Sequence, residues 1–150
     1  AAGFEINGKG LLFPGKSGAG KSTLSRVFSE ATDAEILSDD RMLVRRRGGL
    51  LKTYGTPWAG EAGAARNRDA ELAAIFFIHH GAGAAIERLP VRDAFERLLP
   101  IASIPWFDKE RMPKVLEFCE AITNQVPAYA FSFRPDKGAA DAILHFMQSS

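Results

Sequence analysis

A glycine-rich octapeptide at residues 15–22 constrains the fold of this chain more than any other feature of its sequence. It reads Gly-Lys-Ser-Gly-Ala-Gly-Lys-Ser and matches the pattern G-x-x-x-x-G-K-[ST], in which a β-strand turns directly into an α-helix. Apolar residues 11–13 precede it, and residues 21–31 place Leu24, Val27 and Phe28 on one helical face. The sequence therefore predicts a strand, a tight loop and a helix in that order.

The same pattern predicts a phosphate ligand, because the backbone N–H groups of such a loop and the positive end of the following helix point at one anion. Lys21 is expected to reach the β- and γ-phosphates of a nucleotide, and the Ser22 hydroxyl to coordinate Mg²⁺. A plain glycine-rich turn is the alternative, and the order of strand, loop and helix argues against it. The residues expected to contact the nucleotide are Gly15, Lys16, Ser17, Gly18, Ala19, Gly20, Lys21, Ser22 and Thr23.

The segment before the loop is unusual for a phosphate-binding loop. Residues 4–6 alternate in polarity, residues 7–10 have turn composition, and residues 11–13 are apolar, which together indicate a tight β-hairpin. In an ordinary doubly wound nucleotide-binding domain, the strand that feeds the loop usually has no hairpin partner directly before it. The sequence therefore predicts a mixed sheet in an α/β domain, with an antiparallel neighbour beside the strand that enters the loop.

The rest of the chain alternates strand and helix patterns. Residues 55–63 form a long glycine-containing segment of the kind that is usually functional, and we expect Trp58 there to line an active site and Trp106 to pack in the core or an interface. Asp108 and Asp136 are expected N-caps. Further helices are predicted at residues 91–99, at 108–124 and after 136, and strands at 36–38, 42–44, 50–54, 73–79, 86–89 and 128–133.

Composition indicates one domain over residues 1–150 and gives no sign of a charged macromolecular partner. The net charge is +1, so overall charge implies neither a nucleic acid nor a membrane surface, and no apolar run is long enough to span a bilayer. The single Cys119 cannot form an internal disulfide and is expected to be a core residue. Because the chain starts at Ala1 without a Met, we expect a truncated N-terminus, and a cytoplasmic setting fits this composition best.

A pair of acidic residues, Asp39 and Asp40, ends the short apolar strand at residues 36–38. A carboxylate at the end of a strand beside a phosphate-binding loop can hold the Mg²⁺ that bridges the phosphates, and a second can act as general base on an attacking hydroxyl. Alone, the pair would be a simple turn before Arg41. Beside the loop at residues 15–22, we interpret it as part of a phosphoryl-transfer site.

Three segments together resemble the kinase domain of HPr kinase/phosphorylase and its relatives. They are residues 15–24, residues 36–40 and the segment Tyr-Gly-Thr-Pro-Trp-Ala-Gly-Glu at residues 54–61. That family is similar in fold to the ATP-dependent phosphoenolpyruvate carboxykinases, and both have a phosphate-binding loop after a β-hairpin and an Asp-Asp motif on a following strand. The resemblance implies the same mixed-sheet architecture here.

The resemblance also implies residue roles. Asp39 would deprotonate the acceptor hydroxyl, Lys21 would act on the transferred phosphate, and Ser22 and Asp40 would hold Mg²⁺, with Glu61 as a further metal contact or a solvated loop carboxylate. Residues 55–63 are more similar to the short, stand-alone HPr-kinase-like proteins than to true HPr kinases. HPr itself is therefore not the expected acceptor.

These observations predict an Mg-ATP-dependent phosphotransferase that acts on a hydroxyl of a small molecule or a protein, with a homo-oligomer possible. The alternatives are a nucleotide-binding switch or accessory protein without catalysis, and an ordinary phosphate-loop small-molecule kinase or ATPase. Some basic residues outside the loop could contact an anion or could simply be surface charges. They are the run at residues 45–47, and Arg66, Arg68 and Arg88.

Overall fold

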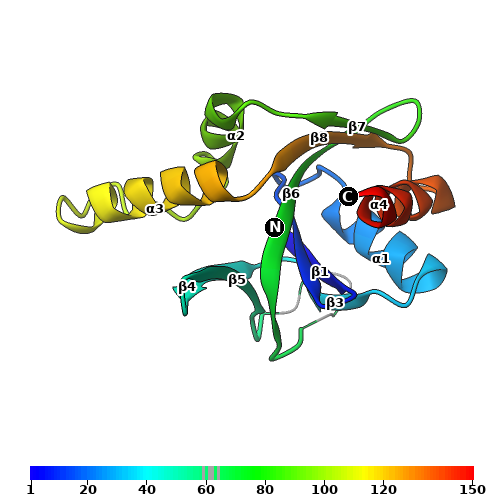
Figure 1. Cartoon of the computed structure of the whole chain (residues 1–150), viewed down its shortest axis with the longest axis horizontal. Coiled ribbons are helices and arrows are strands. Elements are labelled where there is room, and N and C mark those ends of the chain that lie inside the picture. The colour runs from blue at the N-terminus through cyan, green and yellow to red at the C-terminus, as the bar shows by residue number, and fades with distance from the viewer. Residues whose placement is uncertain (59, 61–62, 64) are drawn as a thin grey trace.

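The structure, a computed structural model, describes residues 1–58, 60, 63 and 65–150. Within these residues, eight strands form one mixed sheet that is flanked by four helices (Figure 1). The elements in chain order are β1 (Ala2–Ile6), β2 (Lys9–Phe13), α1 (Lys21–Ala31), β3 (Glu35–Ser38), β4 (Met42–Arg47), β5 (Leu50–Gly55), β6 (Asp69–His80), β7 (Ala85–Arg88), α2 (Val91–Leu98), α3 (Arg111–Gln125), β8 (Ala128–Phe133) and α4 (Lys137–Ser149).

The strand that enters the glycine-rich loop has one neighbour of each orientation. β1 and β2 form the predicted antiparallel hairpin, and the other edge of β2 pairs in parallel with β6. β3 pairs antiparallel with the outer edge of β1, so the chain that follows β3 returns to the same region as the loop. The predicted mixed α/β sheet is therefore confirmed.

β6 organises the rest of the sheet because two strands share one of its edges. β5 pairs antiparallel with its first residues, 69–71, whereas β8 pairs in parallel with residues 75–80. β4 extends the sheet from β5, and β7 extends it from β8. Since β2, β6 and β8 are parallel, their carboxyl ends lie at one edge of the sheet, where loops commonly bind ligands.

Alternating side chains of β6 supply two cores, one on each face of the sheet. Phe76 and Ile78 face the helix pair α1 and α4, whereas Ile75 and Phe77 face α2 and α3. Figure 1 shows α1 beside α4, with α2 and α3 lying apart from them. The fully buried rings of the first core include Phe4, Phe13 and Phe28, and they hold α1 directly behind the loop.

Several local predictions are confirmed, and two need correction. The Asp136 side chain caps α4 by accepting from the N–H of Gly138 (2.9 Å). Asp108 accepts from the N–H groups of Glu110 and Arg111, but α3 begins only at Arg111 because a turn intervenes. Trp106 is 61% exposed, so it does not pack in the core, and packing in an interface stays a prediction.

Cys119 is buried against the second core, as predicted, and burial raises the pKa of its thiol. A thiol in these surroundings is a small apolar side chain and a poor nucleophile at neutral pH. None of the helices in the described part of the chain is both long and apolar enough to span a bilayer.

Candidate functional site

The loop at residues 14–20 leads from β2 into α1, and two glycines give it its shape. Gly18 has a φ of 82°, and Gly20 has a φ of 101° as the N-cap of α1. Because Gly20 has no side chain, no side-chain hydrogen bond caps the helix. Among the described residues, no backbone carbonyl accepts from the N–H groups of Gly20, Lys21 or Ser22. The positive end of α1 is thus open to an anion.

A comparison of Gly20→Ala with Gly18→Ala tests this geometry. Both substitutions place an L side chain at positive φ, but only a Cβ at position 20 meets neighbours, His80 Cε1 and Phe133 Cζ, each at 3.1 Å. We expect Gly20→Ala to lower the free energy of unfolding by about 1–2 kcal/mol more than Gly18→Ala, because it adds a packing clash to the backbone strain. Urea denaturation measures the difference, and equal destabilisation by the two variants would contradict the packing described here.

The Lys21 side chain folds back over the loop. Its Nζ donates to the carbonyl oxygens of Gly15 (2.9 Å) and Lys16 (2.8 Å). An ammonium group has three N–H donors, so one donor remains for a phosphate oxygen. The two carbonyls therefore position the charge at the open end of α1.

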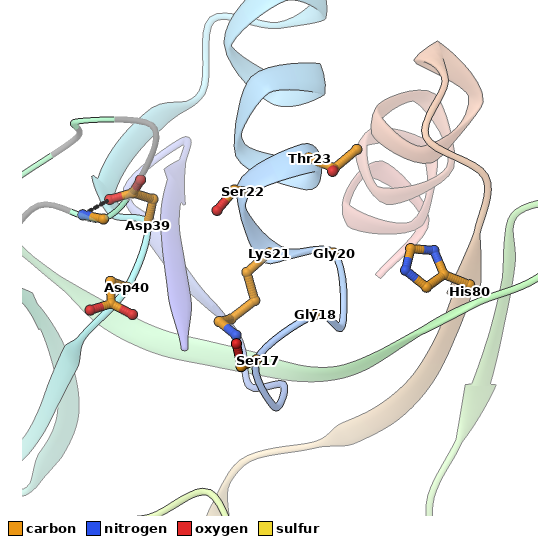
Figure 2. A pocket seen from close by; sticks show the side chains of 10 residues that line it. Ser17, Gly18, Gly20, Lys21, Ser22, Thr23, Asp39, Asp40 and His80 are labelled. Atoms are coloured by element: carbon orange, nitrogen blue, oxygen red, sulfur yellow. Dashed lines mark hydrogen bonds between the residues drawn. The ribbon is translucent and has the colours of Figure 1, made fainter.

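The loop and the acidic pair line one pocket of about 780 Å³. Figure 2 shows Asp39 and Asp40 on one side of it, His80 on the other, and Lys21 between them. The pocket thus unites segments that are far apart in the sequence. It is lined by Ser17, Gly18, Gly20, Lys21, Ser22, Thr23, Asp39, Asp40, Gly60 and His80.

The two carboxylates differ in their surroundings. Asp39 is only 2% exposed, and its Oδ1 accepts from the N–H of Gly60 at 2.7 Å. The Asp40 side chain is 51% exposed, and its Oδ2 lies 3.8 Å from Nε of Arg41. Asp39 is therefore held in one orientation, whereas Asp40 is open to solvent and ligands.

Residues beyond β5 pack along this acidic segment. A Cβ at Gly60 would lie 2.9 Å from Cβ of Asp40 and 3.0 Å from Cγ of Asp39, so only glycine fits between the carboxylates. Two residues before Trp58, Thr56 donates its hydroxyl proton to the carbonyl oxygen of Arg41 (2.8 Å). Hydrogen bonds from Thr56 to Arg41 and from Gly60 to Asp39 therefore anchor the first and last residues of the segment 39–41.

Not every predicted residue of the loop lines this pocket. Gly15 and Lys16 contribute carbonyl oxygens to Lys21 and line an adjoining pocket instead. Ala19 packs against the first core. Ser17, Gly18, Gly20, Lys21, Ser22 and Thr23 do line it, together with both aspartates. Glu61 lies outside the described residues.

A second pocket of about 940 Å³ adjoins the first and shares Ser17, Lys21 and Asp40 with it. Its walls are mainly apolar. They come from β4, from the segment after β5, from the segment after α2 and from one face of α3, and they include Met42, Val44, Trp58, Ile101, Val115 and Phe118. Trp58 thus lines this second pocket rather than the first, and the prediction that it lines an active site stays a prediction. Arg41 lies over the Trp58 ring, 5.8 Å from its centre, at the boundary of the two pockets.

The arginines considered for transition-state stabilisation are placed elsewhere. Arg68 pairs with Glu5 (3.4 Å) and with Glu35, and Arg88 donates to the hydroxyl of Tyr129 (3.0 Å). Arg66, Arg68 and Arg88 do not line the first pocket. The run at residues 45–47 belongs to β4 and is exposed.

Sequence reasoning left Gly60 and His80 out of the site. His80 is the last residue of β6, and the parallel pairing of β6 with β2 brings it to the edge where the loop begins. The apolar run before it was the available signal, because a central parallel strand usually ends at the ligand-binding edge. Gly60 lies in the segment at residues 54–61 that carries the resemblance, and membership of that segment was its only signal.

The donor set suits Mg²⁺ bound together with a nucleotide. The described residues contain no cluster of three or more His, Cys, Asp or Glu side chains that could hold a metal alone. Magnesium bound to nucleotides takes one or two carboxylates, and substrate phosphates and waters supply the rest. Ser22 and Asp40 line the same pocket and fit that requirement.

A search of protein-family models gives no match for this chain, and a search of curated proteins gives no significant match. The resemblance to HPr kinases therefore stays a prediction from the sequence motifs.

Proposed function

We propose that this chain is an Mg-ATP-dependent phosphotransferase of the HPr kinase and phosphoenolpyruvate carboxykinase type, which phosphorylates a hydroxyl group. The observation that carries the proposal is the pair of adjoining pockets that meet at Lys21 and Asp40. A protein that only binds or hydrolyses a nucleotide needs the first pocket but not the second. A transferase needs a donor site and an acceptor site that share the reacting phosphate.

In this proposal, the triphosphate binds at the open end of α1 against the N–H groups of Gly20, Lys21 and Ser22. Lys21 neutralises charge on the β- and γ-phosphates, because charge-assisted hydrogen bonds from an ammonium group are stronger than neutral ones. Ser22 and Asp40 would hold Mg²⁺, which supplies further charge neutralisation at the phosphates. Asp39, which lines the pocket and accepts from the N–H of Gly60, would act as the base.

Transfer of the γ-phosphoryl group from ATP to a hydroxyl needs no other reactant. The acceptor oxygen forms a bond to the γ-phosphorus, and the bond between that phosphorus and the β,γ-bridging oxygen breaks. The hydroxyl proton passes to the Asp39 carboxylate, and ADP leaves with the bridging oxygen. Since phosphoryl transfer requires mainly positioning and charge neutralisation, a shallow site with fixed donors can perform it.

A variant that fills the second pocket tests the division into donor and acceptor sites. Ala102 lines the second pocket and not the first, so Ala102→Trp should leave MgATP binding unchanged. Transfer should fall by about tenfold or more, since a displaced acceptor loses its alignment with the phosphate. The assay incubates the protein with γ-labelled ATP, Mg²⁺ and native extract, and follows label in the acceptor and in inorganic phosphate.

Wild-type protein should give a labelled acceptor, and Ala102→Trp should not, while calorimetry shows the same MgATP affinity for both. Label that appears only in inorganic phosphate, equally with both proteins, would indicate an ATPase. MgATP binding without label in either product would indicate a nucleotide-binding switch.

A further inference from the structure

We propose that His80 forms a nucleoside subsite, in which its imidazole ring stacks on the base of the bound nucleotide. This inference rests on the proposed nucleotide binding and deepens it. It assigns a direction to the nucleotide in the first pocket: the γ-phosphate lies at the acidic end and the base at the β6 end.

The two ends of the pocket differ chemically. Asp39 and Asp40 form one end, and ionised carboxylates repel phosphate oxygens unless a cation lies between them. His80 forms the other end, and Figure 2 shows Lys21 and Gly20 lying between the two ends. The terminal phosphate, which needs Lys21 and Mg²⁺, therefore belongs at the acidic end, and the remaining part of the nucleotide extends toward His80.

The surroundings of His80 suit a stacking platform. Its ring centre lies 5.9 Å from that of Phe133, which is fully buried and supports one side of the imidazole. His80 itself is exposed, and among the described residues its ring nitrogens form no hydrogen bond. Stacking needs only a supported aromatic surface, and every nucleic-acid base has a π-face that can use one.

Gly20 brings this platform close to the phosphates. A Cβ at position 20 would lie 3.1 Å from His80 Cε1, so the absence of a side chain lets the imidazole approach the loop closely. The neighbouring His79 pairs with Ser132 in the β6–β8 ladder, whereas His80 pairs with Phe133. Successive residues of a strand point to opposite faces, so His79 is a matched control that does not share the pocket.

The experiment compares ATP with inorganic tripolyphosphate, both with Mg²⁺, by calorimetry on the whole chain. His80→Ala should weaken ATP binding about tenfold, a typical loss when an aromatic partner of a base is removed. Tripolyphosphate binding should stay unchanged, because that ligand has no base. His80→Phe should restore ATP affinity, and His79→Ala should leave both ligands unaffected.

Equal weakening of both ligands by His80→Ala would overturn the proposal and make His80 a phosphate contact. Unchanged ATP affinity in His80→Ala, or wild-type protein that binds both ligands equally well, would also overturn it. These outcomes are separate from failure of the proposed transferase activity. If the protein binds ATP through His80 but transfers no phosphate, the nucleoside subsite stands and the proposed transferase activity is rejected.

Discussion

Lys21→Ala is expected to abolish nucleotide binding and phosphoryl transfer together. The Lys21 ammonium group is the cation that two loop carbonyls place at the open end of α1. Lys16, the other lysine of this segment, lines the second pocket and not the first. We expect kcat/KM to fall about a thousandfold or more, in line with the loss of other groups that stabilise transferred phosphate. MgATP calorimetry and the label-transfer assay measure the two effects.

Lys9→Ala is the matched control for this variant. Lys9 is an exposed lysine at the opposite end of β2, away from the loop, so its removal changes net charge equally without touching the pocket. It should bind MgATP as the wild type does. A Lys21→Ala protein that is folded by circular dichroism and still binds MgATP normally would reject the nucleotide site.

Asp39→Asn should separate binding from chemistry. Asparagine has nearly the same shape, and its amide oxygen can still accept from the N–H of Gly60, so MgATP affinity should remain close to that of the wild type. The variant cannot take the acceptor proton, and kcat should fall about 10²- to 10⁴-fold, the usual contribution of a general base. Measurement at saturating MgATP isolates this effect on kcat.

Two further substitutions make the Asp39 result specific. Asp33→Asn removes an exposed carboxylate before β3 and should leave transfer intact. Asp40→Asn should raise the Mg²⁺ concentration needed for half-maximal rate, because Asp40 is the proposed metal ligand. Normal kcat in Asp39→Asn, with a lost rate in Asp40→Asn, would reverse the two roles. Normal transfer in both variants would remove the acidic pair from the mechanism.

The parts of the site that local sequence determines were predictable. The hairpin of β1 and β2, the helix at Lys21–Ala31 and the end of β3 before Asp39 depend on residues that are close in the chain. Turn composition, helical periodicity and a short apolar run are sufficient to locate such elements.

The other parts depend on pairing between distant segments, which one sequence does not show. The position of His80 depends on how β6 pairs with β5 and β8 along one edge. The register of β6 in the sheet is in turn set by the packing of side chains on both faces of the sheet. Gly60 reaches Asp39 from the segment after β5, across 21 positions of sequence. The residue type of Trp106 predicts packing in the core or in an interface, but Trp106 lies in the turns between α2 and α3 and its side chain is largely exposed.

The hydrogen bonds of Gly60 and Thr56 to residues 39–41 link the two pockets. Gly60 lines the first pocket and Trp58 lines the second, and both lie in the short segment whose bonds orient Asp39 and Arg41. If a ligand in one pocket displaced these contacts, the lining of the other pocket would change as well. Because such coupling is reciprocal, the factor by which a bound acceptor changes the affinity for MgATP must equal the factor by which MgATP changes the affinity for the acceptor.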